Sequence, residues 1–226
     1  TLLLFKKGHL YMTVVKPLQI QSYEQLKQLL LDGHFLPDTI YSETKTSKDL
    51  GVSRTPMRDA IQKLEQEGYI DVIPSKGFRL HKMTEKDLIE TYQIRCALEG
   101  FCAVHFANTC DTPEAKRLFH TLESLLRDMD AIASTTEDIE EFERYDSEFH
   151  RRLVYSLDNK AMSGVFDAYH YCMSRQTVAS LQTEDRLRQT VTEHKAMLDN
   201  MKAGNVGGSY MATMKHIGQA RNLIEL

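Results

Sequence analysis

The sequence of 226 residues has no tryptophan, few cysteines and no long apolar run. No stretch reaches the roughly 18 consecutive apolar residues of a membrane-spanning helix, so we expect no membrane partner. No internal repeat or low-complexity tract is visible, so a repeat array is not expected. The cysteines form no CxxC pair and lie in apolar helical context. We therefore interpret all four as reduced, buried thiols: Cys96, Cys102, Cys110 and Cys172.

Residues 1–15 carry a few apolar residues and two lysines, and we interpret them as an N-terminal extension. No small-residue cleavage site follows, so a secretory signal peptide is not expected. The protein is therefore predicted to be cytoplasmic. Met12 is a candidate natural start, which leaves open whether residues 1–11 belong to the native product.

The composition is that of a globular protein, but the charge is unevenly distributed. Hydrophobic residues make up 42% of the chain and charged residues 27%, values at which disorder is not expected. The net charge of −4 argues by itself against a polyanionic partner. However, residues 16–82 hold ten lysines and arginines against nine acidic residues, whereas residues 83–226 hold sixteen against twenty-three. Acidic residues are therefore concentrated in the second segment, and the first is weakly basic, so any affinity of the first segment for a polyanion should fall as salt rises.

Residues 51–60, GVSRTPMRDA, have the features of a DNA-recognition helix. Gly51 permits a tight turn, and Ser53 is a preferred N-cap whose side-chain oxygen can accept a backbone N–H. Pro56 sits in the first turn, where its missing N–H costs nothing. Arg54 and Arg58 are four residues apart, so they project from one face at the N-terminal end of the helix. Their forked donors suit guanine edges or phosphates.

A short hairpin is expected after this helix, which ends near Gly68. Two β-rich runs, residues 69–73 and 78–80, flank a turn cluster with Lys76 at its tip. By itself, a basic amphipathic helix followed by a hairpin is also what an ordinary solvent-exposed surface without DNA-binding function looks like. The complete order of helix, turn, capped basic helix and basic wing tip instead indicates a winged helix-turn-helix that binds double-stranded DNA.

The segment from about residue 19 to residue 83 resembles the winged-helix domain of the GntR family of bacterial regulators. The resemblance rests on the run from Leu50 to Pro56 and on more widely spaced positions: Tyr23, Leu26, Leu30, Gly33, Pro37, Ser42, Glu43, Arg58, Ala60, Leu64, Gly68 and Gly77. It implies that the two arginines read the operator, that hydroxyls at the helix start touch the DNA backbone, and that the wing tip enters the minor groove.

The chain departs from this family where an arginine and a leucine usually follow the Ser-Glu pair. Thr44 and Thr46 stand there, which puts one DNA contact in doubt and allows the operator to differ from the family's usual palindrome. The resulting DNA-binding set is Arg54, Arg58, Ser53, Thr55, Thr44, Lys45, Lys76 and Gly77.

From residue 84 onward the pattern is helical throughout. Breaks between the periodic stretches predict six helices, over residues 84–107, 112–132, 137–157, 161–182, 185–203 and 206–224. Thr84 is a candidate N-cap with Asp87 at the N3 position, a variant of the capping box. The predicted fold is mainly α. A winged helix-turn-helix of three helices and a two-stranded wing over residues 16–82 precedes an all-α bundle over residues 83–226.

Four residues of the helical half form a candidate metal site. Asp146 and His150 are four residues apart, so a carboxylate and an imidazole can converge on one ion. His194 and His216 lie on two later helices, and bundle helices commonly build metal sites from such inward side chains. This ligand set suits Zn²⁺, our first choice, and by ligand type also Ni²⁺, Fe²⁺, Mn²⁺ or Cu²⁺. A single helical histidine is more often a surface residue, so spacing alone is weak evidence.

The helical half resembles the FCD effector domain of the FadR branch of the GntR family. The shared features are Arg95 and Glu99 in YQIRCALEG, the Asp146 and His150 pair, Glu193 with His194, and His216. The resemblance implies that the four candidate ligands hold a divalent metal and that the arginine meets a carboxylate which also coordinates the metal. Six helices place the chain nearer the VanR-like subgroup than the seven-helix one.

Arg95 has two interpretations. It can form a structural salt bridge with Glu99, four residues on. Beside a bound cation it can instead capture a carboxylate effector, because two charge-assisted hydrogen bonds and a metal bond then share the negative charge. We favour capture. Helical tyrosines are more often core or interface residues, but we include two in the effector-binding set: Arg95, Tyr92, Tyr145 and Arg175.

Together these features predict a homodimeric, metal-containing repressor that binds a palindromic operator and responds to a small organic acid. Three alternatives remain: the ion is itself the signal, the ion is structural, or the domain is a metal-dependent hydrolase or lyase. An enzyme also needs a placed general base. Glu148, two residues after Asp146, points away from the ligand face. We therefore expect no enzyme and assign no catalytic residue.

Overall fold

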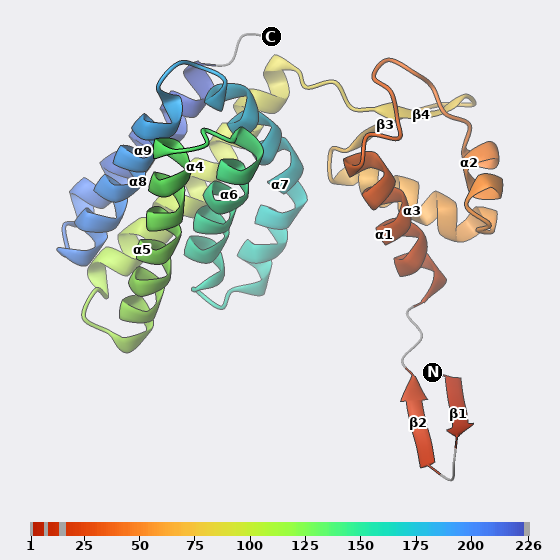
Figure 1. Ribbon diagram of the computed structural model, residues 1–226, viewed down its shortest axis with the longest axis horizontal. Coiled ribbons are helices and arrows are strands. Elements are labelled where there is room, and N and C mark those ends of the chain that lie inside the picture. The colour runs from red at the N-terminus through yellow and green to blue at the C-terminus, as the bar shows by residue number, and fades with distance from the viewer. Residues whose placement is uncertain (1, 7–8, 14–16, 224–226) are drawn as a thin grey trace. The chain divides into compact units, whose positions relative to one another are not determined.

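The computed structural model describes residues 2–6, 9–13 and 17–223, and the chain divides into two compact units, Thr1–Lys82 and Met83–Leu226 (Figure 1). The first unit begins with an antiparallel hairpin of β1 (Leu2–Lys6) and β2 (His9–Thr13). This hairpin falls within the predicted N-terminal extension. Residues 1, 7–8 and 14–16, which belong to or adjoin that extension, lie outside the described residues.

Three helices and a two-stranded sheet form the rest of the first unit: α1 (Leu18–Leu31), α2 (Glu43–Asp49), α3 (Arg54–Gln66), β3 (Ile70–Ile73) and β4 (Gly77–Leu80). Met57, Ile61 and Leu64 recur at helical spacing on α3 and are buried where α3 packs on α1. Strands β3 and β4 are antiparallel. The predicted winged helix-turn-helix is confirmed.

The wing is tied to the segment between α1 and α2. Tyr41 forms an isolated antiparallel bridge with Phe78, whose N–H donates to the Tyr41 carbonyl at 2.9 Å. Gly77 has a φ of 131°, and a Cβ there would lie 1.9 Å from the Tyr41 carbonyl oxygen. Glycine is therefore required at position 77 by the close approach of two backbones.

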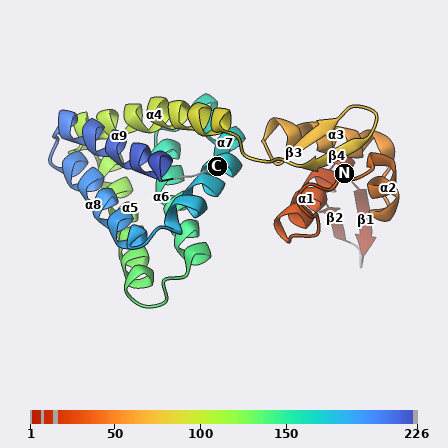
Figure 2. The ribbon, with the colours of Figure 1, turned by 90° about the horizontal axis from the view of Figure 1, so that it is seen from above.

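The described residues of the second unit, 83–223, form six helices, as predicted: α4 (Glu85–Asn108), α5 (Pro113–Ser134), α6 (Ile139–Tyr155), α7 (Lys160–Leu181), α8 (Arg186–Lys202) and α9 (Val206–Asn222). Helix α4 is central because it contacts α6, α7, α8 and α9. Figure 2 shows α9 running beside it. Among the described residues, no helix is both long enough and apolar enough to span a membrane.

The start of α4 has the predicted capping box. The Asp87 N–H donates to Thr84 Oγ1 at 3.3 Å, and the Thr84 N–H donates to Asp87 Oδ2 at 2.7 Å. Each side chain thus satisfies a backbone donor that the first helical turn leaves without a partner. The helix that carries Arg95 and Glu99 therefore starts at a residue fixed by its own sequence.

The cysteines are all free, but only Cys102 is buried. It lies within the apolar core of the bundle, beside residues such as Phe106 and Phe149. Cys96, Cys110 and Cys172 are partly exposed, so the prediction of four buried thiols was wrong for these three. A thiol is small and weakly polar, so a cysteine can lie at the edge of a core. Apolar neighbours in the sequence therefore do not show that a cysteine is buried.

Candidate DNA-binding face and candidate metal centre

The residues of α3 that are predicted to contact DNA lie on its exposed surface. Arg54, Thr55 and Arg58 are exposed, whereas Pro56 and Met57 are buried, so the face with the arginines is not used in packing. The exposed three line a hollow of about 580 Å³ with residues of α2 and α3, namely Glu43, Thr44, Asp59 and Gln62. Gln62 was not predicted, although it stands four residues after Arg58 and so shares its face.

A second hollow, of about 240 Å³, joins the start of α2 to the wing tip. Thr44 lines both hollows, and Lys76 and Gly77 line the second. Lys45, the next residue on α2, is exposed, as is Lys76. Six of the eight predicted DNA-binding residues therefore line these two hollows, which share Glu43 and Thr44.

Ser53 occupies the N-cap of α3 as predicted, but its hydroxyl accepts no capping hydrogen bond. The usual donor for an N-cap side chain is the backbone N–H of the second or third helical residue. The third residue here is Pro56, which has no N–H. The expected cap interaction was therefore wrong, and the exposed hydroxyl stays free of the helix it begins.

Asp146, His150, His194 and His216 come together from three helices in the interior of the bundle. Each is at most 3% exposed. His150 Nε2 lies 3.0 Å from His194 Nε2 and 3.2 Å from His216 Nε2. The Asp146 carboxylate lies 3.7 Å from His150 Nε2 and 3.6 Å from His194 Nε2. The predicted four residues thus form one cluster.

The spacing of these four ligand atoms fits one metal ion. Nitrogen and oxygen ligands sit about 2.0–2.2 Å from Zn²⁺, so tetrahedral ligands are roughly 3.3 Å from one another. The four separations given above, 3.0–3.7 Å, lie on both sides of that value, and all four ligand atoms lie within 4.8 Å of one another. Asp146 Oδ1 is buried and accepts no hydrogen bond within the described chain. A cation would supply the missing partner.

Two carboxylates outside the cluster indicate which nitrogens carry protons. His216 Nδ1 lies 2.8 Å from Glu193 Oε2, and His150 Nδ1 lies 2.6 Å from Glu99 Oε2. A carboxylate accepts, so we assign the proton of each ring to Nδ1. The lone pairs of both Nε2 atoms then point into the cluster, as metal ligation requires.

Burial dominates the electrostatics of the cluster. It raises the pKa of Asp146 to about 6 and lowers the pKa of His150 and His216. The pKa of His194 falls furthest, because the two other imidazoles add to the effect of burial. Burial alone would raise the pKa of Glu193, but hydrogen bonds, the first from His216, hold it at about 2. Neutral imidazoles and ionised outer carboxylates suit a metal site.

Arg95 is linked to the cluster through Glu99. Its Nε donates to Glu99 Oε1 at 2.7 Å, so the salt bridge considered for it is present. Burial alone would raise the pKa of Glu99, but Arg95 and then His150 hold it well below its usual range. Arg95 Nη2 is buried and has no hydrogen-bond partner among the described residues. One edge of the guanidinium is thus left for another acceptor.

The other predicted effector-binding residues make contacts of their own. Tyr92 is half-buried, with the guanidinium of Arg221 5.1 Å from its ring centroid. Tyr145 packs at the margin of a small apolar core cluster. Arg175 is exposed, with its guanidinium 5.7 Å from the ring centroid of Tyr171. A part for these three in ligand binding stays a prediction.

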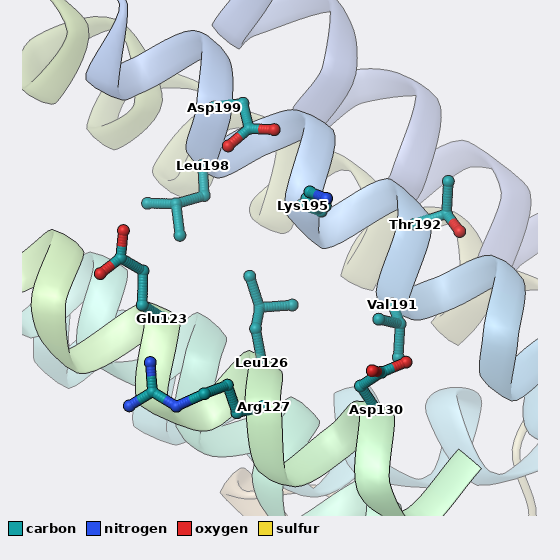
Figure 3. Close-up of a pocket in the computed structure, with 9 residues that line it drawn as sticks. All are labelled: Glu123, Leu126, Arg127, Asp130, Val191, Thr192, Lys195, Leu198 and Asp199. Atoms are coloured by element: carbon teal, nitrogen blue, oxygen red, sulfur yellow. The ribbon is translucent and has the colours of Figure 1, made fainter. Parts of the chain in front are cut away.

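A surface hollow between α5 and α8 lies apart from this chemistry. It has a volume of about 560 Å³ and is lined by Glu123, Leu126, Arg127, Asp130, Val191, Thr192, Lys195, Leu198 and Asp199 (Figure 3). Acidic and basic side chains alternate along it, and none belongs to the buried cluster. The size of this hollow therefore does not point to the candidate metal cluster.

Comparison with known proteins matches both halves of the chain to described families. Residues 18–80 match the family described as bacterial regulatory proteins, gntR family. Residues 90–219 match the FCD domain. Both matches lie within the units that the structure separates.

Individual proteins agree with these matches. The chain is 30% identical over 204 residues to the HTH-type transcriptional regulator YdhC of Bacillus subtilis (strain 168), covering 88% of each chain. It is 26% identical over 176 residues to the gluconate operon transcriptional repressor of the same strain, covering 78% of this chain and 69% of that one. The solved structure of E. coli McbR/YncC shares the fold, with a TM-score of 0.68, 20% identity and coverage of 91% and 95%.

Proposed function

The chain belongs to the GntR family of bacterial regulatory proteins and carries an FCD domain, and from this premise we propose that it is a metal-containing repressor controlled by a small carboxylate. Family membership makes it a DNA-binding transcription regulator and not an enzyme.

The exposed face of α3 supports the proposal that Arg54 and Arg58 contact the operator. Arg54 and Arg58 line one hollow together with Thr44. Thr44 also lines the second hollow, together with Lys76 of the wing tip. Forked guanidiniums suit base edges in the major groove, and a lysine at a wing tip suits phosphate or the minor groove. Repression is proposed because similar proteins bear the names of repressors, one of them of a gluconate operon.

The observation that carries the metal proposal is the meeting of three imidazole nitrogens and a carboxylate oxygen within 4.8 Å of one another in a buried site. Asp146, His150, His194 and His216 would hold the ion. We propose Zn²⁺ first, because three nitrogens and one oxygen at this spacing suit it, while Ni²⁺, Fe²⁺, Mn²⁺ and Cu²⁺ accept the same ligand types. When bound, the ion supplies a positive charge that attracts an anionic ligand.

The free edge of Arg95 supports a carboxylate effector. Its Nη2 has no acceptor among the described residues, and leaving a buried cationic donor unpaired is costly. A small organic acid could accept from this atom and also meet the cation. Such an acid can shift DNA affinity only by binding one arrangement of the protein more tightly than another.

A homodimer is proposed because a palindromic operator is bound by a protein with matching two-fold symmetry. Large apolar side chains are exposed on neighbouring helices α4 and α9: Phe101 is 55% exposed, Tyr210 45% and Met211 66%. Burying them against a second copy would remove this apolar surface from water. Sedimentation of the full chain with and without Phe101→Glu tests this face, and a monomeric wild type at micromolar concentration would contradict it.

The function is tested by DNA binding as metal and acid are varied separately. Duplexes are first selected from random DNA by the full chain, and their affinity is measured with small carboxylic acids, with and without chelation. We expect one acid to change the affinity only in metal-loaded protein, and Arg95→Ala to abolish that response. A response to metal alone would instead support a metal sensor. No response to either, with metal bound, would support a structural ion.

A further inference from the structure

One histidine of the metal cluster is held by a buried ion pair. Arg186 is 1% exposed, and its Nη1 and Nη2 donate to the two oxygens of Glu193, each at 2.8 Å. Glu193 Oε2 also lies 2.8 Å from His216 Nδ1. A continuous chain of hydrogen bonds therefore runs from a guanidinium, through a carboxylate, to an imidazole whose other nitrogen faces the remaining ligands.

Helix geometry explains how α8 serves both the cluster and this chain. Arg186 and Glu193 are seven residues apart, two turns on one face, so their side chains can meet. Glu193 and His194 are adjacent and so point about 100° apart around the helix. His194 therefore reaches the cluster directly, while Glu193 reaches His216 on α9.

The three histidines of the cluster are not held equally. Glu193 accepts two hydrogen bonds from Arg186, whereas the carboxylate facing His150 receives one from its arginine. His194 Nδ1 is buried without a hydrogen-bond partner among the described residues. Of the three histidines, His216 therefore faces the carboxylate that is held in place by the larger number of hydrogen bonds from an arginine.

We propose that Arg186 and Glu193 are positioning residues for His216: they hold its Nδ1 protonated and its ring fixed, so that Nε2 presents a lone pair to the metal. This inference rests on the proposed metal binding. A bidentate guanidinium fixes both carboxylate oxygens in a plane, and outer carboxylates orient metal-bound histidines. A buried ion pair is weak evidence for stability, because desolvation offsets its attraction. Arg186 Nε also lacks a partner in the described chain, which adds to that cost.

The test measures metal affinity in full-length variants. Glu193→Gln keeps the shape of the side chain but removes its charge, and Arg186→Met removes the guanidinium. Arg188→Met is the matched control, because Arg188 lies on the same helix in an exposed pair with Glu137. Zn²⁺ affinity is measured by chelator competition, the visible spectrum is recorded with Co²⁺, and the melting temperature of each metal-free variant is recorded alongside.

We expect Glu193→Gln and Arg186→Met to weaken Zn²⁺ binding by about 10- to 100-fold and to change the Co²⁺ spectrum, with the control within about twofold of wild type. Unchanged Zn²⁺ affinity and spectrum in Glu193→Gln would overturn the positioning role, even if that variant melts at a lower temperature. If Arg186→Met does not fold, Glu193→Gln decides alone. If the wild type binds no ion, the proposed metal site itself is wrong. If the wild type and both variants bind Zn²⁺ equally well, the metal site stands and only the positioning role is wrong.

Discussion

His150 and His194 bring their Nε2 atoms to 3.0 Å from each other in a site where neither residue is more than 3% exposed. His150 Nδ1 lies 2.6 Å from Glu99 Oε2, and we assign the ring proton to this nitrogen, which leaves a lone pair on Nε2. His216 Nε2 faces the same point, 3.2 Å from His150 Nε2. Converging lone pairs repel unless a proton or a cation lies between them. The cluster is therefore arranged for an ion that accepts from all of them.

Asp146→Asn should act on stability with opposite signs in the metal-free and the Zn²⁺-loaded protein. Burial raises the pKa of Asp146 from 3.8 to about 6, so its ionised form costs the metal-free fold up to about 3 kcal/mol. The folded pKa lies above the unfolded one, so this cost is complete above pH 6 and disappears as pH falls toward 3.8. With Zn²⁺ bound, the substitution removes a charged ligand and should lower the melting temperature.

Thermal melts between pH 5 and 8, with Zn²⁺ or with chelator, check this sign change. The metal-free variant should melt above wild type at pH 7.5, and the difference should shrink toward pH 5. Asp199→Asn, at an exposed position of α8, serves as control. A variant that is less stable than wild type in chelator at pH 7.5 would contradict the account.

Arg54→Ala and Arg58→Ala should each weaken binding to selected duplexes by about 1–3 kcal/mol, because each removes a forked donor from the exposed face of α3. Lys76→Ala should weaken binding to all duplexes alike and reduce its salt dependence by about one unit of slope. Fluorescence anisotropy at several salt concentrations measures both effects. Arg117→Ala, an exposed arginine of the other unit, is the control and should have no effect. If Arg58→Ala bound the selected duplexes as tightly as this control, Arg58 would have no role in reading bases.

Gly77→Ala should destabilise the DNA-binding unit whether or not position 77 touches DNA. An added Cβ would lie 1.9 Å from the Tyr41 carbonyl oxygen, at a φ of 131° that only glycine adopts readily. Gly164→Ala in α7 is the control: its Cβ would meet nothing within 4 Å, and in a helix interior it should stabilise by roughly 0.5–1 kcal/mol. Chemical denaturation of both variants is the measurement. An unchanged midpoint for Gly77→Ala would refute the packing requirement.

Cys102 should be the last thiol to react in the native protein. It is fully buried, and burial raises its pKa to about 12. Cys172 is partly exposed, and burial raises its pKa to about 11. Because the thiolate is the reactive form, a charged disulfide reagent should modify Cys172 before Cys102, and both should react equally in denaturant. Mass mapping of the modified peptides checks the order, and early modification of Cys102 would contradict the described core.

Local chemistry made much of the fold predictable. Thr84 and Asp87 form the predicted capping box, and the periodic apolar pattern with its breaks located the six helices that the described residues of the bundle form. Spacing of four residues also placed Asp146 and His150 on one face of α6. Such features depend on neighbours in the chain, which a sequence displays directly.

Contacts between helices explain what sequence reasoning missed. Ser53 begins α3 without a capping hydrogen bond, and Pro56 removes one of the two usual backbone donors, a local effect that the preference for serine at N-caps does not include. The contact of Glu99 with His150 joins α4 to α6, and no spacing rule relates residues on two helices. The Arg186 and Glu193 pair could have been found from its seven-residue spacing, but its link to His216 depends on how α8 packs on α9.

Elemental analysis of the purified full-length chain tests the metal site most directly, with Asp146→Ala and His194→Ala as variants and His120→Ala, at an exposed position, as control. We predict about one divalent ion per chain in wild type and in the control, loss of the ion in both ligand variants, and a lower melting temperature of wild type after chelation. An ion content that is zero in wild type, or that neither ligand substitution changes, would contradict the assignment of this cluster as a metal centre.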